Sequence, residues 1–283
     1  MTFSIVARLD GGVPGIDGPA WGVAVASKFL AAGAAVPSAT AGAGAVASQA
    51  YANLAYHEQA RLLLADGAFA AAVVAALTDD DELAAQRQVG IVDAVGGSAT
   101  FTGGECFDWA GGVTGDGYAI QGNILTGPEV VEAMEHAWLA HPDEPLARRL
   151  LAALLAGDRA GGDSRGRQSA AVLVVAEGAG YGGGNDVSVD LRVDDHRDPV
   201  VELGRLLDIH QLLFGRPEST LPMTGEVAAR LRAALDTLGY RDQDLEAALN
   251  AAAGIENLEE RIVPGAVDPV VLEYLESLAA GDG

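Results

Sequence analysis

The sequence predicts an α+β fold in which layers of strands and helices are stacked, followed by a small helical module. The predicted order is three strands, two helices, further strands, two helices and two more strands, which differs from the regular strand–helix alternation of a doubly wound sheet. The chain has 283 residues, of which 49% are apolar, so it can bury the core of one large domain and a small one.

The first strands are predicted by alternation and by turn residues. Residues 2–8 alternate between two faces, and residues 21–26 form a second apolar run. The segment between them, 11–19, is rich in glycine and proline, so the two runs are predicted to pair as a hairpin. A third run, 42–49, has small side chains that allow close approach of another backbone or a ligand.

Helices and strands then follow in turn. The spacing of apolar residues predicts helices at about 54–66 and 68–77. Two strands are predicted within residues 87–102, on either side of Gly96-Gly97, and another at 117–123.

The next helix has a clear predicted start. Thr126 is the N-cap candidate, with Pro128 in the first turn and Glu129 three residues after the cap. A further helix at about 144–156 carries a leucine stripe and is predicted to end at Gly157.

The chain is predicted to divide into a domain of residues 1–215 and a small helical domain of residues 216–283. Arg216 to Ser219 has the composition of a linker. Before it, strands are predicted at 169–176 and 187–193, with a helix from Pro199 to Gly215; after it, helices are predicted at about 224–238, 242–253 and from Asp268-Pro269.

The charge balance excludes some partners. Forty acidic and 17 basic residues give a formal net charge of −23, which disfavours nucleic acid and anionic membrane surfaces. Sixteen of the 17 basic residues are Arg, and Lys28 is the single lysine. We interpret this composition as that of a salt-adapted organism; GC-biased codon usage would explain the missing lysines but not the net charge.

Cysteine usage and hydropathy exclude several further classes of protein. One cysteine, Cys106, cannot form an internal disulfide, and no Cys/His spacing matches a structural zinc site. No apolar run reaches the ~20 residues of a membrane span, and residues 1–4 do not start a secretory signal. We therefore expect a cytoplasmic protein without a metal or cofactor.

Thr2 is the main candidate for chemistry. Removal of Met1 would leave a threonine whose α-amino group, with a pKa near ~8, can take the proton of its own hydroxyl. Lys28 follows the second predicted strand, so the hairpin would return its ammonium toward Thr2. Because very many chains begin Met-Thr, an ordinary strand start is the competing interpretation.

Several sequence blocks resemble a known family. They are residues 1–8, 22–29, 87–93, 121–125, 161–170 and 190–196. These blocks resemble the domain-of-unknown-function family 1028, placed in the N-terminal-nucleophile (Ntn) hydrolase superfamily, over about residues 1–215. Residues 217–283 resemble a peptidoglycan-binding-like module. The resemblance implies a four-layer αββα sandwich and no known substrate.

The resemblance also implies roles for individual residues. Thr2 matches the nucleophile, whereas Ser27 lies where proteasome-like relatives place an aspartate. Their lysine is on the third strand, so Lys28 would fill that role from a different position. The remaining candidates are a strand end with Gln121, Gly122 and Asn123, a support loop with Asp163, and oxyanion N–H donors from Gly42 or Gly44.

Two function classes remain open from the sequence. One is an Ntn amidohydrolase that cleaves a small amide or peptide-like bond through an acyl-enzyme, and the other is a non-catalytic binding or scaffold protein on the same fold. The state of Met1 distinguishes them. We expect a homo-oligomer in either case, and we interpret Cys106 as a small buried apolar residue rather than a nucleophile.

Overall fold

The structure, a computed structural model, describes residues 2–281 and has an α+β fold with eight α-helices in that range. Contacts divide the chain into two compact units, Met1–Leu207 and Asp208–Gly283. The division falls inside helix α5 (Pro199–Phe214), whereas the sequence places it after residue 215. No helix among residues 2–281 is long and apolar enough to cross a membrane.

The first unit contains a six-stranded sheet with the strand order β10-β9-β2-β1-β8-β7, in which all neighbours are antiparallel. Strand β1 is central because it pairs with β2 on one side and β8 on the other. The strands are β1 (Thr2–Asp10), β2 (Pro19–Ser27), β7 (Gly111–Gly115), β8 (Tyr118–Asn123), β9 (Ser169–Ala176) and β10 (Val187–Val193).

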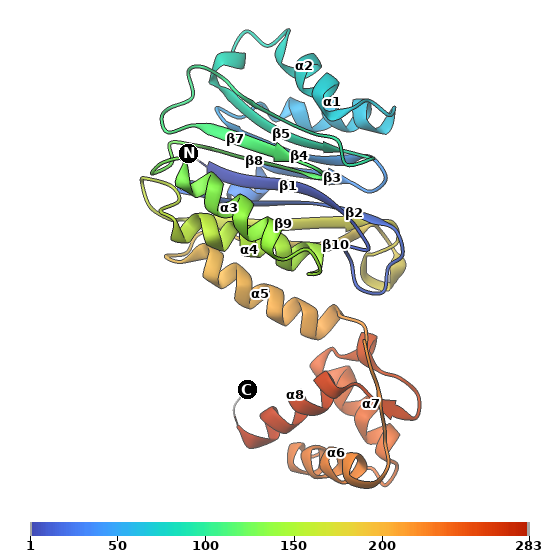
Figure 1. The fold of residues 1–283 in the computed structure, drawn as a ribbon. Coiled ribbons are helices and arrows are strands. Elements are labelled where there is room, and N and C mark those ends of the chain that lie inside the picture. Colours follow the sequence, from blue (N-terminus) through green and yellow to red (C-terminus); the bar gives the residue numbers. More distant parts are fainter. Residues whose placement is uncertain (1, 282–283) are drawn as a thin grey trace. The chain divides into compact units, whose positions relative to one another are not determined.

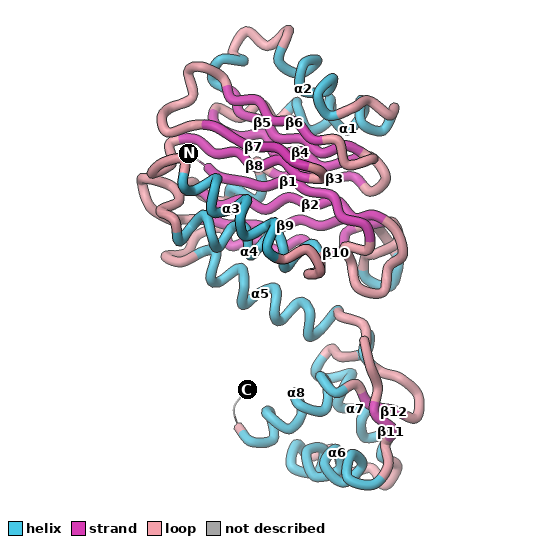
Figure 2. The backbone as a smooth tube through the Cα atoms, in the orientation of Figure 1, coloured by secondary structure: helices cyan, strands magenta, loops and turns pink. Residues whose placement is uncertain are grey.

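A second, four-stranded antiparallel sheet packs on the first. Its order is β3 (Pro37–Thr40), β4 (Gly44–Ala50), β5 (Arg87–Asp93) and β6 (Ser98–Thr102). Small and β-branched side chains fill the interface between the sheets, including Val6, Val23, Ala45, Ala47 and Val92. Figure 2 shows the strands of both sheets stacked between helices.

Each sheet has a pair of helices on its outer face (Figure 1). Helices α1 (Ala55–Ala65) and α2 (Ala70–Thr78) cover the four-stranded sheet. Helices α3 (Glu129–Ala140) and α4 (Leu146–Arg159) cover the six-stranded sheet, where the α4 leucine stripe is buried. The early hairpin and the amphipathic helices predicted from the sequence are therefore confirmed.

Some predicted boundaries were wrong. Pro128, not Thr126, is the N-cap of α3, and no side chain caps that end. Helix α4 continues through Gly157 to Arg159. A Cβ on Gly157 would lie 2.7 Å from Cγ of Met134, so this glycine permits close packing of α3 on α4 instead of ending a helix. Strands β3 and β7 were not predicted.

The second unit is a small helical cluster. Buried leucine, valine and alanine side chains join its helices into one core. Asp268 caps α8 by accepting a hydrogen bond from the Val270 N–H, and its carboxylate also pairs with buried Arg261 at 2.5 Å. Its elements are α6 (Gly225–Leu238), α7 (Leu245–Glu256), α8 (Pro269–Ala280), β11 (Leu221–Pro222) and β12 (Ala266–Val267).

Candidate functional site

Three sequence-predicted residues meet where β1 begins. Thr2 opens β1 and lies opposite Asn123, the last residue of β8, in the strand ladder. Because β2 returns antiparallel to β1, its last residue, Ser27, also reaches this end. The hydroxyl oxygens of Thr2 and Ser27 lie 3.1 Å apart, and both residues are buried. Met1, whose removal would expose the Thr2 α-amine, lies outside the described residues.

Asp163 joins these strand ends to the loop after α4. Its Oδ2 accepts a hydrogen bond from the backbone N–H of Lys28 at 2.6 Å, and its Oδ1 accepts one from the Arg165 N–H at 2.9 Å. The Arg165 guanidinium lies 3.4 Å from Oδ2. Asp163 also bridges Leu125, just beyond β8. The Asp163 carboxylate therefore holds the loop against the end of β2, and the Asp163 backbone holds it against the segment after β8.

Lys28 takes part in this support through its backbone. Its side chain is exposed, and its ammonium has no hydrogen bond or ion pair with the residues that the structure describes. The contact that the structure provides is thus the N–H to Asp163, and the predicted contact of the ammonium with Thr2 is not present.

A buried glutamine fixes the amide of Asn123. Gln88 on β5 accepts hydrogen bonds at Oε1 from Asn123 Nδ2 and from Gln49 Nε2, both at 2.8 Å. Its own Nε2 donates to the Gly122 carbonyl oxygen at 2.7 Å. Since all of these groups lie between the sheets, each needs a partner there, and Gln88 supplies them.

Gln121 and Gly122 belong to the same polar layer. Gln121 Nε2 donates to Ser4 Oγ at 2.7 Å, and Ser4 Oγ donates to Gln49 Oε1 at 2.7 Å. Gly122 provides its carbonyl oxygen to Gln88, and a Cβ on it would lie 2.4 Å from Leu125 Cδ1. Gln121 and Gly122 therefore organise the interface between the sheets.

The structure does not bring Gly42 and Gly44 to Thr2. Gly44 pairs with Asp93 at the start of β4, while Ala50 at the other end of β4 lies near the Thr2 side. Six residues of strand separate the two ends by about 20 Å. The reason is β3, a strand that was not predicted: Gly42 lies in the β3–β4 turn, with a φ of +75°.

A cavity of about 540 Å³ opens beside Asn123. This volume suits a small organic ligand. Asn123 is both a wall of the cavity and the ladder partner of Thr2, so it connects the cavity to the strand ends. The apolar wall is Ala50, Tyr51, Cys106, Phe107 and Ile124, and the polar groups are Gln86, Glu105, Asn123 and Arg165.

Two residues of this wall have an unusual backbone. Ala50 has a φ of +67° and Ile124 a φ of +52°, a region that L-residues with side chains rarely adopt. The conformation is costly for β-branched Ile124 above all. Such backbone strain is concentrated at functional sites, so it favours this cavity as the functional one.

Comparison with known families identifies the first unit. Residues 2–203 match the "Family of unknown function (DUF1028)". The chain belongs to this family. Residues 212–275 of this DUF1028 protein match a "Putative peptidoglycan binding domain".

A solved structure supports the same assignment. The DUF1028 protein is similar to the crystal structure of protein SPO2555 from Silicibacter pomeroyi, which matches the same family. The two are 33% identical, the match covers 80% of this chain and 88% of the other, and the TM-score is 0.65. No curated protein matches the chain.

Cys106 provides a thiol in the cavity wall of the DUF1028 protein. Its thiol donates a hydrogen bond to the Arg87 carbonyl oxygen at 3.3 Å. Burial raises the pKa of the Cys106 thiol, so the protonated, unreactive form is favoured at neutral pH.

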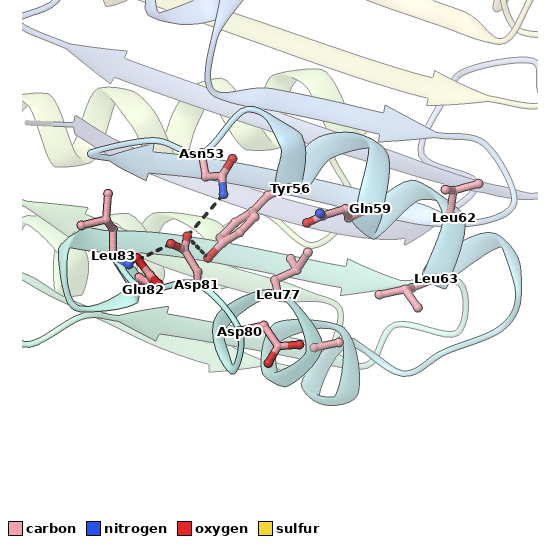
Figure 3. Close-up of a pocket in the computed structure, with 11 residues that line it drawn as sticks. Asn53, Tyr56, Gln59, Leu62, Leu63, Leu77, Asp80, Asp81, Glu82 and Leu83 are labelled. Carbon is pink, nitrogen blue, oxygen red and sulfur yellow. Dashed lines mark hydrogen bonds between the residues drawn. The ribbon is translucent and has the colours of Figure 1, made fainter.

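A second cavity, of about 650 Å³, lies beside α1 and α2 (Figure 3). Asp81 is its central polar group. The Asp81 carboxylate accepts hydrogen bonds from Tyr56 at 2.7 Å, Asn53 at 3.3 Å and Arg87 at 2.9 Å, so these partners already occupy it. Among residues 2–281 no cluster of three or more His, Cys, Asp or Glu could hold a metal.

Sequence reasoning missed the residues that surround Asn123 in the DUF1028 protein. Gln49 and Gln88 are polar residues beside apolar ones on buried strands, and this pattern is the signal that could have identified them. Tyr51 and Arg165 lie in loops, where periodicity gives no indication of a cavity.

Proposed function

We propose that this protein is an Ntn amidohydrolase whose nucleophile is Thr2, on a four-layer αββα sandwich of the Ntn type. The observation that carries the proposal is the position of Thr2. It opens the central strand, its hydroxyl lies 3.1 Å from that of Ser27, and its ladder partner Asn123 lines the 540 Å³ cavity. The substrate is a small amide or peptide-like molecule.

The proposed reaction uses the free α-amine of Thr2 as its base, so Met1 must first be removed. The amine takes the hydroxyl proton while Oγ1 attacks the amide carbon. The tetrahedral oxyanion collapses, the ammonium returns the proton to the leaving amine, and an ester remains on Thr2. Water, activated by the same amine, then attacks the ester and releases a carboxylic acid.

Asn123 is the proposed donor to the oxyanion. A side-chain amide nitrogen carries two protons, and Gln88 accepts one of them. The second is the donor that a developing oxyanion at the cavity would use. Ser27 orients the Thr2 hydroxyl, and Asp163 keeps the neighbouring loop in place.

Intact mass and an electrophilic probe test the proposal. We expect the active protein to begin at Thr2, and an acyl or epoxyketone probe to label Thr2 in peptide mapping. Thr2→Ala should fold normally and lose hydrolysis of amide substrates, while Thr2→Ser should keep part of it, since serine retains a hydroxyl beside the amine.

Cys106→Ala is the matched control, because Cys106 provides a thiol in the cavity wall that would compete with Thr2 for an electrophilic probe. Its activity should equal that of the unmodified protein. Label on Cys106, or hydrolysis by a preparation that retains Met1, would contradict the mechanism. Hydrolysis with Met1 in place would make an enzyme of another mechanism the better account, whereas no hydrolysis at all would favour the binding or scaffold interpretation.

A further inference from the structure

We propose that the 540 Å³ cavity recognises an aromatic ring on the acyl or amine side of the substrate, held against Tyr51 and Phe107, with the amide bond at Asn123. The proposal rests on the amidohydrolase function above, because it names the substrate class of the same site. It also makes a claim about binding that can be measured without turnover.

Tyr51 provides a fixed aromatic face. Tyr51 is 63% exposed, yet the Arg87 guanidinium packs against its ring, with the guanidinium carbon 5.1 Å from the ring centre. Arg87 also donates to the Tyr51 carbonyl oxygen and is itself held by Asp81 at 2.9 Å. The ring is therefore supported before any ligand binds, which lowers the entropy lost on binding.

Phe107 provides the second ring. It is 75% exposed, and its carbonyl oxygen accepts a hydrogen bond from the Ile124 N–H at 2.9 Å. Ile124 directly follows Asn123, so this hydrogen bond holds the backbone of Phe107 close to Asn123, where the amide bond of the substrate is proposed to lie. Two large exposed aromatic side chains in one cavity wall are typical of sites that bind flat apolar groups.

The orientation of the ligand follows from the polar groups. Asn123 adjoins Thr2 in the β1–β8 ladder, so the bond to be cleaved must lie at that end. An aromatic ring gains from contact with Tyr51 and Phe107 both by burial of apolar area and by offset or edge-to-face ring contacts. A saturated ring of similar size gains only the first.

The test compares two ligands on the full-length Thr2→Ala protein, which cannot turn them over by the proposed mechanism. The ligands are N-acetylphenylalaninamide and its cyclohexyl counterpart, and the Kd of each is measured by calorimetric titration. We expect the aromatic ligand to bind about three- to tenfold more tightly. Tyr51→Leu and Phe107→Leu should each remove most of that difference.

Two exposed aromatic residues elsewhere in the same unit are matched controls. Tyr181→Leu and Phe69→Leu should leave both Kd values unchanged, since neither residue lines the cavity. Equal Kd values for the two ligands, or no binding, would overturn the proposal. So would Kd values that Tyr51→Leu and Phe107→Leu leave unchanged.

The outcomes separate this inference from the proposed function. If the ring binds as expected but the unmodified protein hydrolyses no aromatic amide, the amidohydrolase proposal fails and the cavity assignment holds. If aromatic amides are hydrolysed at rates that Tyr51→Leu and Phe107→Leu leave unchanged, the cavity assignment fails and the amidohydrolase proposal holds.

Discussion

Gly90 leaves room for a polar group between the two sheets. A Cβ on Gly90 would lie 2.0 Å from Oε1 of Gln121, whose other amide atom donates to Ser4. The glycine on β5 therefore lets a glutamine of β8 enter the interface and keep its hydrogen bonds. A side chain at this position would have to displace the amide or separate the sheets.

We therefore predict that Gly90→Ala lowers the free energy of unfolding by about 1–3 kcal/mol, because overpacking a dense interior forces neighbours out of place. Urea denaturation followed by circular dichroism measures the change. Gly104→Ala is the control, since a Cβ there meets nothing within 4 Å. Equal stability of both variants would show that the interface can absorb the extra atom.

At the candidate site, the sequence could predict those contacts that follow from the direction in which a hairpin returns. A hairpin from Thr2 must return near Ser27, so those two residues could be placed together from the pattern and the family resemblance. The position of Gly42 and Gly44 depended on an unseen strand, and the Gln88 contacts depended on how two sheets stack. Contacts across sheets leave no periodic signal in one sequence.

Among the elements, the strands that were not predicted are those whose residues have a weak preference for β-structure. Strand β7 contains three glycines in five residues, so it has the composition of a turn, and its pairing with β8 stabilises it as a strand. Strand β3 is four residues long and begins with proline. Strands β9 and β10 were predicted at their observed bounds because β9 is a nearly continuous apolar run and valines recur along β10.

The Asp81–Arg87 pair connects helix α1, the loop after α2 and strand β5. Hydrogen bonds from Arg87 and then Tyr56 lower the pKa of Asp81 below its usual range. Both partners of the ion pair are nearly buried, with side chains 12% and 8% exposed. A folded-state pKa below the unfolded value, near ~4, means that the carboxylate stabilises the fold above that pH. The contribution is lost as pH falls through the lower folded pKa.

We predict that Asp81→Asn reduces the free energy of unfolding at pH 7 by about 2–4 kcal/mol, because Arg87 loses its buried counter-charge. The gap between variant and unmodified protein should shrink as pH falls below about 4. Urea titrations at pH 7, 5 and 3 measure it. Asp80→Asn, an exposed carboxylate of the same cavity, should change stability little at each pH; a constant gap for Asp81→Asn would refute the linkage.

At the scale of the whole molecule, repulsion among carboxylates competes with local ion pairs. The formal charge is −23, so most acidic residues have no basic partner available. Several arginines form exposed pairs within a helix, such as Arg61 with Glu58 and Arg205 with Glu202. Exposed pairs of this kind contribute little to stability. Salt weakens them, but this loss is small compared with the reduced repulsion among the carboxylates.

Stability should therefore rise with ionic strength. Raising KCl from 0.1 M to 1 M shortens the Debye length from about 10 Å to about 3 Å, which screens repulsion between neighbouring carboxylates. We expect Tm to increase by roughly 5 °C or more over this range, measured by circular dichroism or calorimetry. Sucrose at equal osmolality is the control, because it is excluded from the surface but does not screen charge. A Tm that is constant or falls with KCl, or that rises equally in sucrose, would show that charge repulsion does not limit this fold.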